Sequence, residues 1–250
     1  RILTNSIITK DQKIIACWLY LMAILVGLMI VIGGITRLTG SGLSMVEWRP
    51  LIGTLPPLNN NEWIRVFDLY KNSPEYAQLN FGIGMDEFKR IFFWEYFHRL
   101  WGRLLGVFYV LPLIYFFLQK TIPSKYKIPL IGLGIVGGLQ GIVGWWMVTS
   151  GLSQEPTVSQ YRLAIHLFIA LGIFTCLIWL GHSLFLGTSK ILFRIPIFIF
   201  ALIFLTIIAG AFVAGMNAGL LYNQFPLMGD SFIPVEYGEK GILDPFENPA

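Results

Sequence analysis

IIACWLYLMAILVGLMIVIGGI, residues 14–35, contains no charged side chain. A helix needs about 20 mainly apolar residues to cross the hydrocarbon core of a bilayer, so this stretch predicts a transmembrane helix. Four further segments have the same character, and none alternates polar and apolar residues as the strands of a membrane barrel do. These segments are 92–118, whose uncharged part is 104–118, then 128–147, 163–186 and 195–216. The chain is therefore expected to be an all-α integral membrane protein.

The overall composition agrees with a membrane protein and argues against nucleic-acid binding. Hydrophobic residues make up 55% of the chain and charged residues only 13%, whereas soluble domains carry about 25% charged residues. The net charge is a modest +4, and the basic residues lie in short loops and form no basic surface. Cys17 and Cys176 lie in separate apolar runs, so neither a disulfide framework nor a CxxC metal site is expected. The lipid bilayer is the partner that this composition predicts.

Basic residues mark alternate ends of the predicted helices. They are Lys10, Lys13, Lys120, Lys125, Lys127, Lys190 and Arg194. By the positive-inside rule these ends face the cytoplasm or the mitochondrial matrix, and so does the N-terminus. Segments 36–91, 150–160 and 217–250 then face outward. The long segment 36–91 is expected to be a structured outer loop with a short surface helix near 62–70.

A short motif recurs where each outward-going helix ends. It is GSGLS at 40–44, TSGLS at 149–153 and NAGLL at 217–221. A glycine just past a helix end can adopt the left-handed conformation that caps the helix, and three independent caps would explain the pattern. We favour a repeated helical hairpin, because upstream glycines recur as well and would allow close packing or leave room for a flat cofactor. The expected domains are a four-helix bundle, 1–190, and the first helix of a second, incomplete bundle, 191–250, in a chain that continues past residue 250.

The depth of the three histidines separates them. His98 lies 22 residues before Lys120 and His166 lies 24 residues before Lys190, so each is about 30 Å from the inner surface at 1.5 Å per residue. Either histidine alone is explained by a hydrogen bond to a carbonyl or a lipid headgroup. Two at one level across a bundle core are suited to be the axial ligands of a heme iron. His182 lies about 24 Å deeper than His166 and is expected at the inner interface.

Several charged residues surround the two histidines. Arg99, Arg162 and Arg37 are candidates to pair with heme propionates, although arginine at a helix end also reaches water in this way without a ligand. Arg103 lies deeper and needs a partner, either Glu95 or a propionate. Glu95 shares a helix face with His98, where it could handle protons or stabilise a cationic intermediate, or simply pair with Arg99.

The remaining candidates have two interpretations each. The residues Trp94, Trp101, Trp145 and Trp146 are either an aromatic belt at the membrane surface or part of the wall around a ring. Gln140 is either a helix–helix contact or a site residue.

Five motifs carry a resemblance to a known family. They are IGGITRLTGSGLSMVEWRPLIGTLPP (32–57), EFKRIFFWEYFHRLWGR (87–103), GGLQGIVGWWMVTSGL (137–152), VSQYRLAIHL (158–167) and AGMNAGLLYNQFPLM (214–228). Together they resemble the heme A synthase family in its proteobacterial and mitochondrial form, and the chain resembles its N-terminal part. The resemblance implies an eight-helix protein of the bacterial or mitochondrial inner membrane, built from two similar four-helix bundles.

The same resemblance implies a function and roles for residues. Members oxidise the ring methyl of heme O to a formyl group, which makes heme A for cytochrome c oxidase. His98 and His166 match the first pair of metal ligands, in the bundle that holds heme O or heme A, and Glu95 matches the catalytic glutamate. A heme b is expected in the second bundle, and a heme O synthase is the expected supplier. The resemblance leaves open the electron donor and whether the protein is a homo-oligomer.

The sequence departs from the family in two features, and two other functions also fit it. Helices six to eight of the family, with the second histidine pair, are absent from this sequence, so this part alone is not expected to complete the reaction. Some bacterial members carry a cysteine pair in the first outer loop, which has no cysteine here, so the electron route must differ. A membrane b-type cytochrome, transferring electrons without modifying its heme, is the main alternative. A transporter or receptor without a cofactor is the second.

Overall fold

A computed structural model describes residues 9–49, 52–187, 195–222, 226–234, 236–238, 241 and 244–247. Its long helices are α1 (Lys10–Leu38), α4 (Met85–Leu118), α5 (Ser124–Gly151), α6 (Gln160–Leu186) and α7 (Ile195–Gly215). Its short elements are η1 (Ile52–Thr54), α2 (Asn60–Lys71), α3 (Pro74–Gln78), η2 (Ala218–Leu220) and α8 (Asp244–Glu247). The five long helices have the length and apolar character to cross a membrane, which confirms the predicted all-α class.

Four of the five long helices, all but α7, extend beyond the apolar runs that predicted them. α1 begins after Thr9, whose hydroxyl caps the first turn while the Gln12 side chain caps in return. α4 begins after Gly84, seven residues before its apolar run, with Asp86 and Glu87 in its first turn. A hydrophobic run marks only the part of a helix that leaves water, whereas capping groups and first-turn acids determine where the helix begins.

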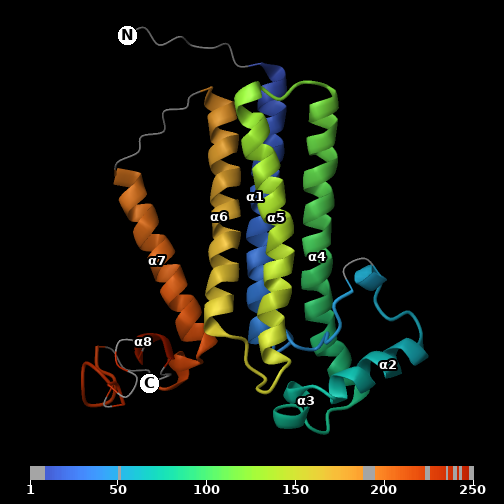
Figure 1. The fold of residues 1–250 in the computed structure, drawn as a ribbon, viewed down its shortest axis with the longest axis vertical. Helices are drawn as coiled ribbons and strands as arrows, with labels where there is room; N and C mark the ends of the chain where they lie inside the picture. Colours follow the sequence, from blue (N-terminus) through green and yellow to red (C-terminus); the bar gives the residue numbers. More distant parts are fainter. Residues whose placement is uncertain are drawn as a thin grey trace.

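Four of the long helices pack as neighbours in a closed ring. α1 packs along both α4 and α6, and α5 packs along the same two helices, so α4 and α6 face each other across the group. Figure 1 shows these four helices side by side, with α7 leaning against α6. Aromatic N–H and O–H groups bond to backbone carbonyls of the neighbouring helix. The contacts are Trp18 to Phe108 (3.0 Å), Trp101 to Leu25 (3.0 Å) and Tyr109 to Leu130 (2.8 Å).

The connections gather at two opposite ends of the helices. α2, α3, α8, η2 and the link between α5 and α6 lie at one end, and the start of α1 and the link between α4 and α5 lie at the other (Figure 1). The described parts of segments 36–91, 150–160 and 217–250 therefore share one end, as predicted. Lys190, Arg194 and the expected domain boundary at 190/191 lie outside the described residues.

Segment 36–91 is a structured module built on the first turns of α4. α2 confirms the short helix predicted near 62–70. Its Phe67 and Tyr70 pack with Phe88 and Phe92 of α4 in an aromatic cluster, with the Phe67 and Phe88 rings stacked 4.8 Å apart. This cluster anchors the module to the helix that carries Glu95 and His98.

Left-handed caps, the alternative to a repeated hairpin, are not found at the glycine that the three motifs share. Gly42, Gly151 and Gly219 are absent from the described residues with positive φ, although Gly40 (59°), the first residue of GSGLS, and Asn217 (55°), the first residue of NAGLL, are among them. Gly151 is needed for space, because a Cβ atom on it would lie 2.8 Å from both terminal methyl carbons of Leu43. The glycine of one motif thus makes room for the leucine of another.

We expect Gly151→Ala to destabilise the protein by about 1–3 kcal/mol, because overpacking forces neighbouring side chains out of their rotamers. Thermal unfolding in detergent would measure the change. In a Leu43→Ala background the same substitution should cost little. Gly132→Ala on the same helix is the control, since a Cβ there meets no atom within 4 Å. An equal cost in both backgrounds would contradict the packing role.

Candidate functional site

His98 and His166 lie at the same level on the two facing helices. His98 is 20 residues before Leu118, the last residue of α4, and His166 is 20 residues before Leu186, the last residue of α6. Both helices run in the same direction, so each histidine is about 30 Å from the inner helix ends. The two imidazoles are also within electrostatic range of each other. The structure thus brings this pair together, and it leaves His182 near the opposite end, exposed and 3.4 Å from the Tyr20 hydroxyl.

Each imidazole packs against a glycine of the adjacent helix. A Cβ atom on Gly33 of α1 would lie 3.1 Å from Cε1 of His98, and one on Gly144 of α5 would lie 3.0 Å from Cε1 of His166. In both rings Nδ1 is buried and has no hydrogen-bond partner among the described residues. Buried polar atoms in proteins are almost always paired, so two matched exceptions indicate groups that are meant to meet a ligand.

Further exposed glycines lie near Gly33 and Gly144 along the same two helices. Gly34 of α1 and Gly137, Gly138 and Gly141 of α5 would each place a Cβ atom with no other atom within 4 Å. The described residues contain no cluster of three or more metal-ligating side chains. A heme iron does not need one, because the porphyrin supplies four nitrogens and the protein supplies one or two axial ligands. The residues present therefore fit a heme.

Gln140 forms a helix–helix contact, as one of the two interpretations of its sequence position predicted. Its Nε2 donates to the backbone oxygen of His166 at 2.8 Å, which ties α5 to α6 beside the imidazole. Its Oε1 is buried without a partner among the described residues.

Glu95 is buried, with 3% of its surface exposed, and its carboxylate accepts from three donors. The Ser44 hydroxyl and the Met45 backbone N–H each donate to Oε2 at 2.7 Å, and Arg99 forms an ion pair with Oε1. Charge-assisted bonds of this kind are about twice as strong as neutral ones, and they suit an ionised carboxylate. The simple Glu95–Arg99 pair considered from the sequence is therefore present, together with two donors from the loop after α1.

Arg99 joins that loop to α4. It donates to the backbone oxygens of Met45 (2.8 Å) and Glu47 (3.0 Å), and its guanidinium lies 5.5 Å from the ring centre of Trp145. Trp145 in turn stacks on Trp48 at 5.8 Å. These contacts hold the loop after α1 against α4, which carries Glu95, and against α5, which carries Gly144.

The other arginines have different neighbours. Arg162 donates to the Trp146 backbone oxygen at 2.7 Å and lies over the Trp146 ring. Arg37 donates to the backbone oxygen of Ala214, at the end of α7. Arg103 donates to the backbone oxygen of Arg49 at 3.0 Å, so the loop supplies a contact that the sequence had assigned to Glu95 or a propionate.

The chain is similar in sequence to a known protein family. The family model for cytochrome oxidase assembly proteins (COX15-CtaA) matches residues 16–250. The chain belongs to this family. Together with the five candidate spanning helices, this membership makes the chain a multi-pass membrane protein.

Curated relatives of this chain are named heme A synthases. The chain is 46% identical to that of Nitrosospira multiformis, over 90% of this chain and 65% of the relative. It is 48% identical to that of Parvibaculum lavamentivorans, over 90% and 66%, and 45% identical to that of Granulibacter bethesdensis, over 96% and 66%. The chain thus spans slightly less than two thirds of their length. No solved structure matches it significantly.

Sequence reasoning missed the loop residues that hold Glu95. Ser44 ends the GSGLS motif and was considered only as part of a helix cap, and Met45 contributes its backbone, which has no sequence signature. A serine in a recurring motif close to a spanning helix was the only available signal.

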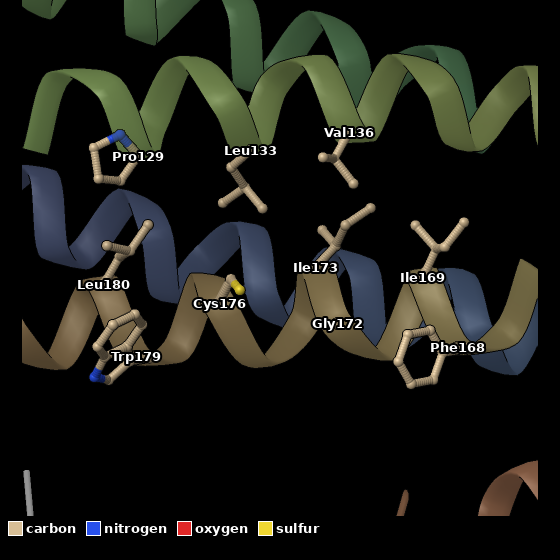
Figure 2. A pocket seen from close by; sticks show the side chains of 10 residues that line it. All are labelled: Pro129, Leu133, Val136, Phe168, Ile169, Gly172, Ile173, Cys176, Trp179 and Leu180. Atoms are coloured by element: carbon tan, nitrogen blue, oxygen red, sulfur yellow. The ribbon is translucent and has the colours of Figure 1, made fainter. Parts of the chain in front are cut away.

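A groove of about 440 Å³ runs between α5 and α6. Leu133, Val136 and Ile169 are among its lining residues. Figure 2 shows side chains of the two helices lining it, including Cys176. Every lining residue is apolar, a glycine or the cysteine, so the groove offers no acid or base for chemistry.

Gly144→Ala and Gly33→Ala should weaken heme binding. The new methyl group would press on the imidazole of His166 or His98, at a cost of about 1–3 kcal/mol. The heme content of purified full-length protein, measured from its Soret absorbance, would report the loss. Gly106→Ala is the matched control, since that position is exposed on α4 with no atom within 4 Å of an added Cβ. Unchanged heme content in both variants would contradict the inference that Gly33 and Gly144 make room for the heme-binding imidazoles.

Proposed function

We propose that this chain is part of a heme A synthase, a membrane oxidoreductase that converts heme O to heme A by oxidising a ring methyl to a formyl group. The observation that carries the proposal is the pair His98 and His166. The two lie at one level on facing helices, each against a glycine and each with an unpartnered Nδ1 among the described residues. The names of the relatives support the specific reaction.

The architecture that goes with this function is a four-helix bundle of α1, α4, α5 and α6, within residues 1–190. α7 would begin a second bundle, in 191–250 and beyond, where a heme b is expected. The clustering of Lys10, Lys13 and Lys120 at one end supports a cytoplasmic position for that end in a bacterial inner membrane. The bacterial origin of the relatives supports the same location.

Substrate binding would rest on groups already described. His98 and His166 would be the axial ligands of the substrate iron, and the heme itself supplies the redox chemistry. Arg99 follows His98 on α4 and Arg162 lies one helical turn before His166 on α6, where the propionates of the substrate could meet them. Arg37, at the end of α1, is the weakest of the three candidates.

Glu95 would serve the reaction from one helical turn away from His98. The proposed chemistry is two successive hydroxylations of the methyl carbon. In each, water supplies the hydroxyl group, two protons are released and two electrons pass to an external oxidant; the resulting geminal diol loses water to give the aldehyde. A fixed carboxylate favours positive charge that develops at this carbon, and it can accept a proton that the oxidation releases. Ser44, Met45 and Arg99 hold the carboxylate in place, so the reaction requires little reorganisation of it.

A membrane b-type cytochrome is the second candidate, and one observation favours it. All three donors around Glu95 belong to the protein, so the carboxylate already has a purely structural role in bracing the loop. In that case the histidine pair would hold a heme that only transfers electrons. Gln140 and Gly144 would support His166 in the same way in a synthase and in a cytochrome.

Pigment extracted from the full-length protein distinguishes the two functions. Heme O, a hydroxylated intermediate or heme A in the extract supports the synthase, and heme b alone supports the cytochrome. Purified protein without Soret absorbance would contradict both and favour a transporter or receptor. A heme O synthase is the proposed supplier of substrate, and the same preparation can be tested for a homo-oligomer and for reduction by candidate electron donors.

A further inference from the structure

A second buried carboxyl group lies in the module formed by segment 36–91. The aromatic cluster of this module packs against Met45, the residue whose backbone N–H donates to Glu95. Glu75 is on α3 and only 5% of its surface is exposed. Its backbone oxygen accepts hydrogen bonds from the N–H groups of Leu79 (2.9 Å) and Asn80 (3.0 Å), which hold the backbone of Glu75 in place. Its Oε2 is buried without a hydrogen-bond partner among the described residues. A buried acid with an unpaired oxygen is costly, and it needs an explanation.

The hydroxyl of Tyr70 is the polar group that acts on the Glu75 side chain from α2. Tyr70 is fully buried, and its oxygen accepts a hydrogen bond from Asn80 Nδ2 at 2.7 Å. With Asn80 filling that acceptor role, the hydroxyl proton is oriented for donation, and Glu75 is the carboxyl with which it interacts. Asn80, Tyr70 and Glu75 therefore form a chain of polar groups inside an aromatic cluster.

Glu95 is the second group that acts on Glu75, from α4. Burial raises the pKa of Glu75 to about 7, the Tyr70 hydroxyl opposes this rise, and the negative charge of Glu95 adds to it. No cation of the described residues contributes. Glu95 accepts from three donors, one of them the Arg99 guanidinium, whereas the Tyr70 hydroxyl is the one donor that acts on Glu75 among the described residues. Such pairs of unlike acids are how proteins divide proton chemistry between two carboxyls.

We propose that Glu75 is a positioning residue that acts through Glu95, and that by holding or releasing one proton it sets the electrostatic potential at Glu95. The inference rests on the proposed heme A synthase function. When Glu75 releases its proton to solvent, one negative charge appears beside Glu95 and no other bond changes. The added charge makes Glu95 a stronger base and favours positive charge at the substrate carbon.

The direction of the pH dependence follows from this arrangement. Below about pH 7 Glu75 is neutral, and above it the group is ionised. Heme A formation should therefore rise through neutral pH, by about three- to tenfold between pH 6 and 8 for two charges in a partly screened site. Folding stability should change in the opposite sense. The native state holds a proton that the unfolded chain, with its ordinary pKa of 4.5, has lost, so stability falls as pH rises from 4.5 to 7.

Glu75→Gln tests both effects in the full-length protein, because glutamine has the shape of the protonated acid and does not titrate. The variant should make heme A at the low-pH level of the wild type at every pH, and its unfolding temperature should no longer fall between pH 5 and 8. Glu62→Gln, an exposed acid of α2, should behave as wild type in both assays. Tyr70→Phe removes the hydroxyl that opposes the pKa rise, so it should move the step to higher pH.

The outcomes separate this inference from the function on which it rests. A flat profile in Glu75→Gln with a step in the wild type supports the inference. The same step in both proteins overturns it and leaves the synthase function intact. If Glu75→Gln does not fold, an unmoved step in Tyr70→Phe overturns it instead. Wild-type protein that makes no heme A at any pH contradicts the proposed function and this inference with it.

Discussion

Full-length protein with His98→Ala or His166→Ala is expected to lose most of the heme bound in this part of the chain. The loss of groups that merely support a metal ligand costs about 10–100-fold in affinity, so loss of an axial ligand should cost at least as much. The two imidazoles lie at one level on facing helices, and no third histidine lies within reach. Neither helix offers a substitute ligand at that depth. Heme content and the Soret spectrum of the purified variants measure the effect.

His182→Ala is the matched control for both histidine variants. His182 is on the same helix as His166 but close to its inner end, where Tyr20 is its hydrogen-bonding neighbour. Its replacement should leave the heme spectrum unchanged. If His182→Ala disturbs the spectrum as much as the other two substitutions do, or if neither of those does, the axial assignment is wrong. A change of spectrum with heme retained would show that one ligand of the pair had been replaced.

Glu95→Gln is expected to reduce heme A formation by about 10²–10³-fold while heme stays bound. Removing a single preorganised electrostatic group typically costs this much in rate. Glutamine keeps an oxygen that can accept from Ser44 and Met45, so the loop after α1 should stay in place. The measurement is the ratio of heme A to heme O in extracted pigment, at equal total heme.

Glu95→Ala shows what the structural role of this residue contributes. It would leave the buried guanidinium of Arg99 without its carboxylate, and breaking a buried pair in this way costs about 3–5 kcal/mol. We therefore expect a lower unfolding temperature in addition to the lost reaction. Asp68→Asn, which breaks an exposed pair with Lys71, should change stability by less than about 1 kcal/mol. Unchanged heme A yield in Glu95→Gln would assign Glu95 to bracing the loop alone.

The membrane-spanning elements could be predicted from the sequence because they depend on local chemistry. An apolar run of the right length leaves water as a helix wherever it lies in the chain, so the five spans were predictable. The level of His98 and His166 followed as well, because a helix rises by a constant amount per residue. Helix ends were less predictable, since capping by Thr9 or by the turn at Gly84 extends a helix beyond its apolar run.

The residues around Glu95 could not be predicted in the same way. Ser44 and Met45 reach Glu95 across about 50 positions of the chain, and no periodicity connects them. The motif glycines illustrate the same limit, because left-handed caps were one explanation for their recurrence, whereas Gly151 is needed for its lack of a Cβ atom. Whether a glycine is used for its backbone conformation or for its small volume depends on what packs against it.

The sequence by itself determined the class of this protein, its five spans, the sharing of one end by its long loops and the common depth of two histidines. All of these follow from hydrophobicity and from the regular rise of a helix. The tertiary structure alone decided that α4 and α6 face each other, that Gly33 and Gly144 hold the imidazoles, and that Glu75 is buried near Glu95. Those features arise from packing between segments far apart in the chain, where shape and burial decide which groups meet.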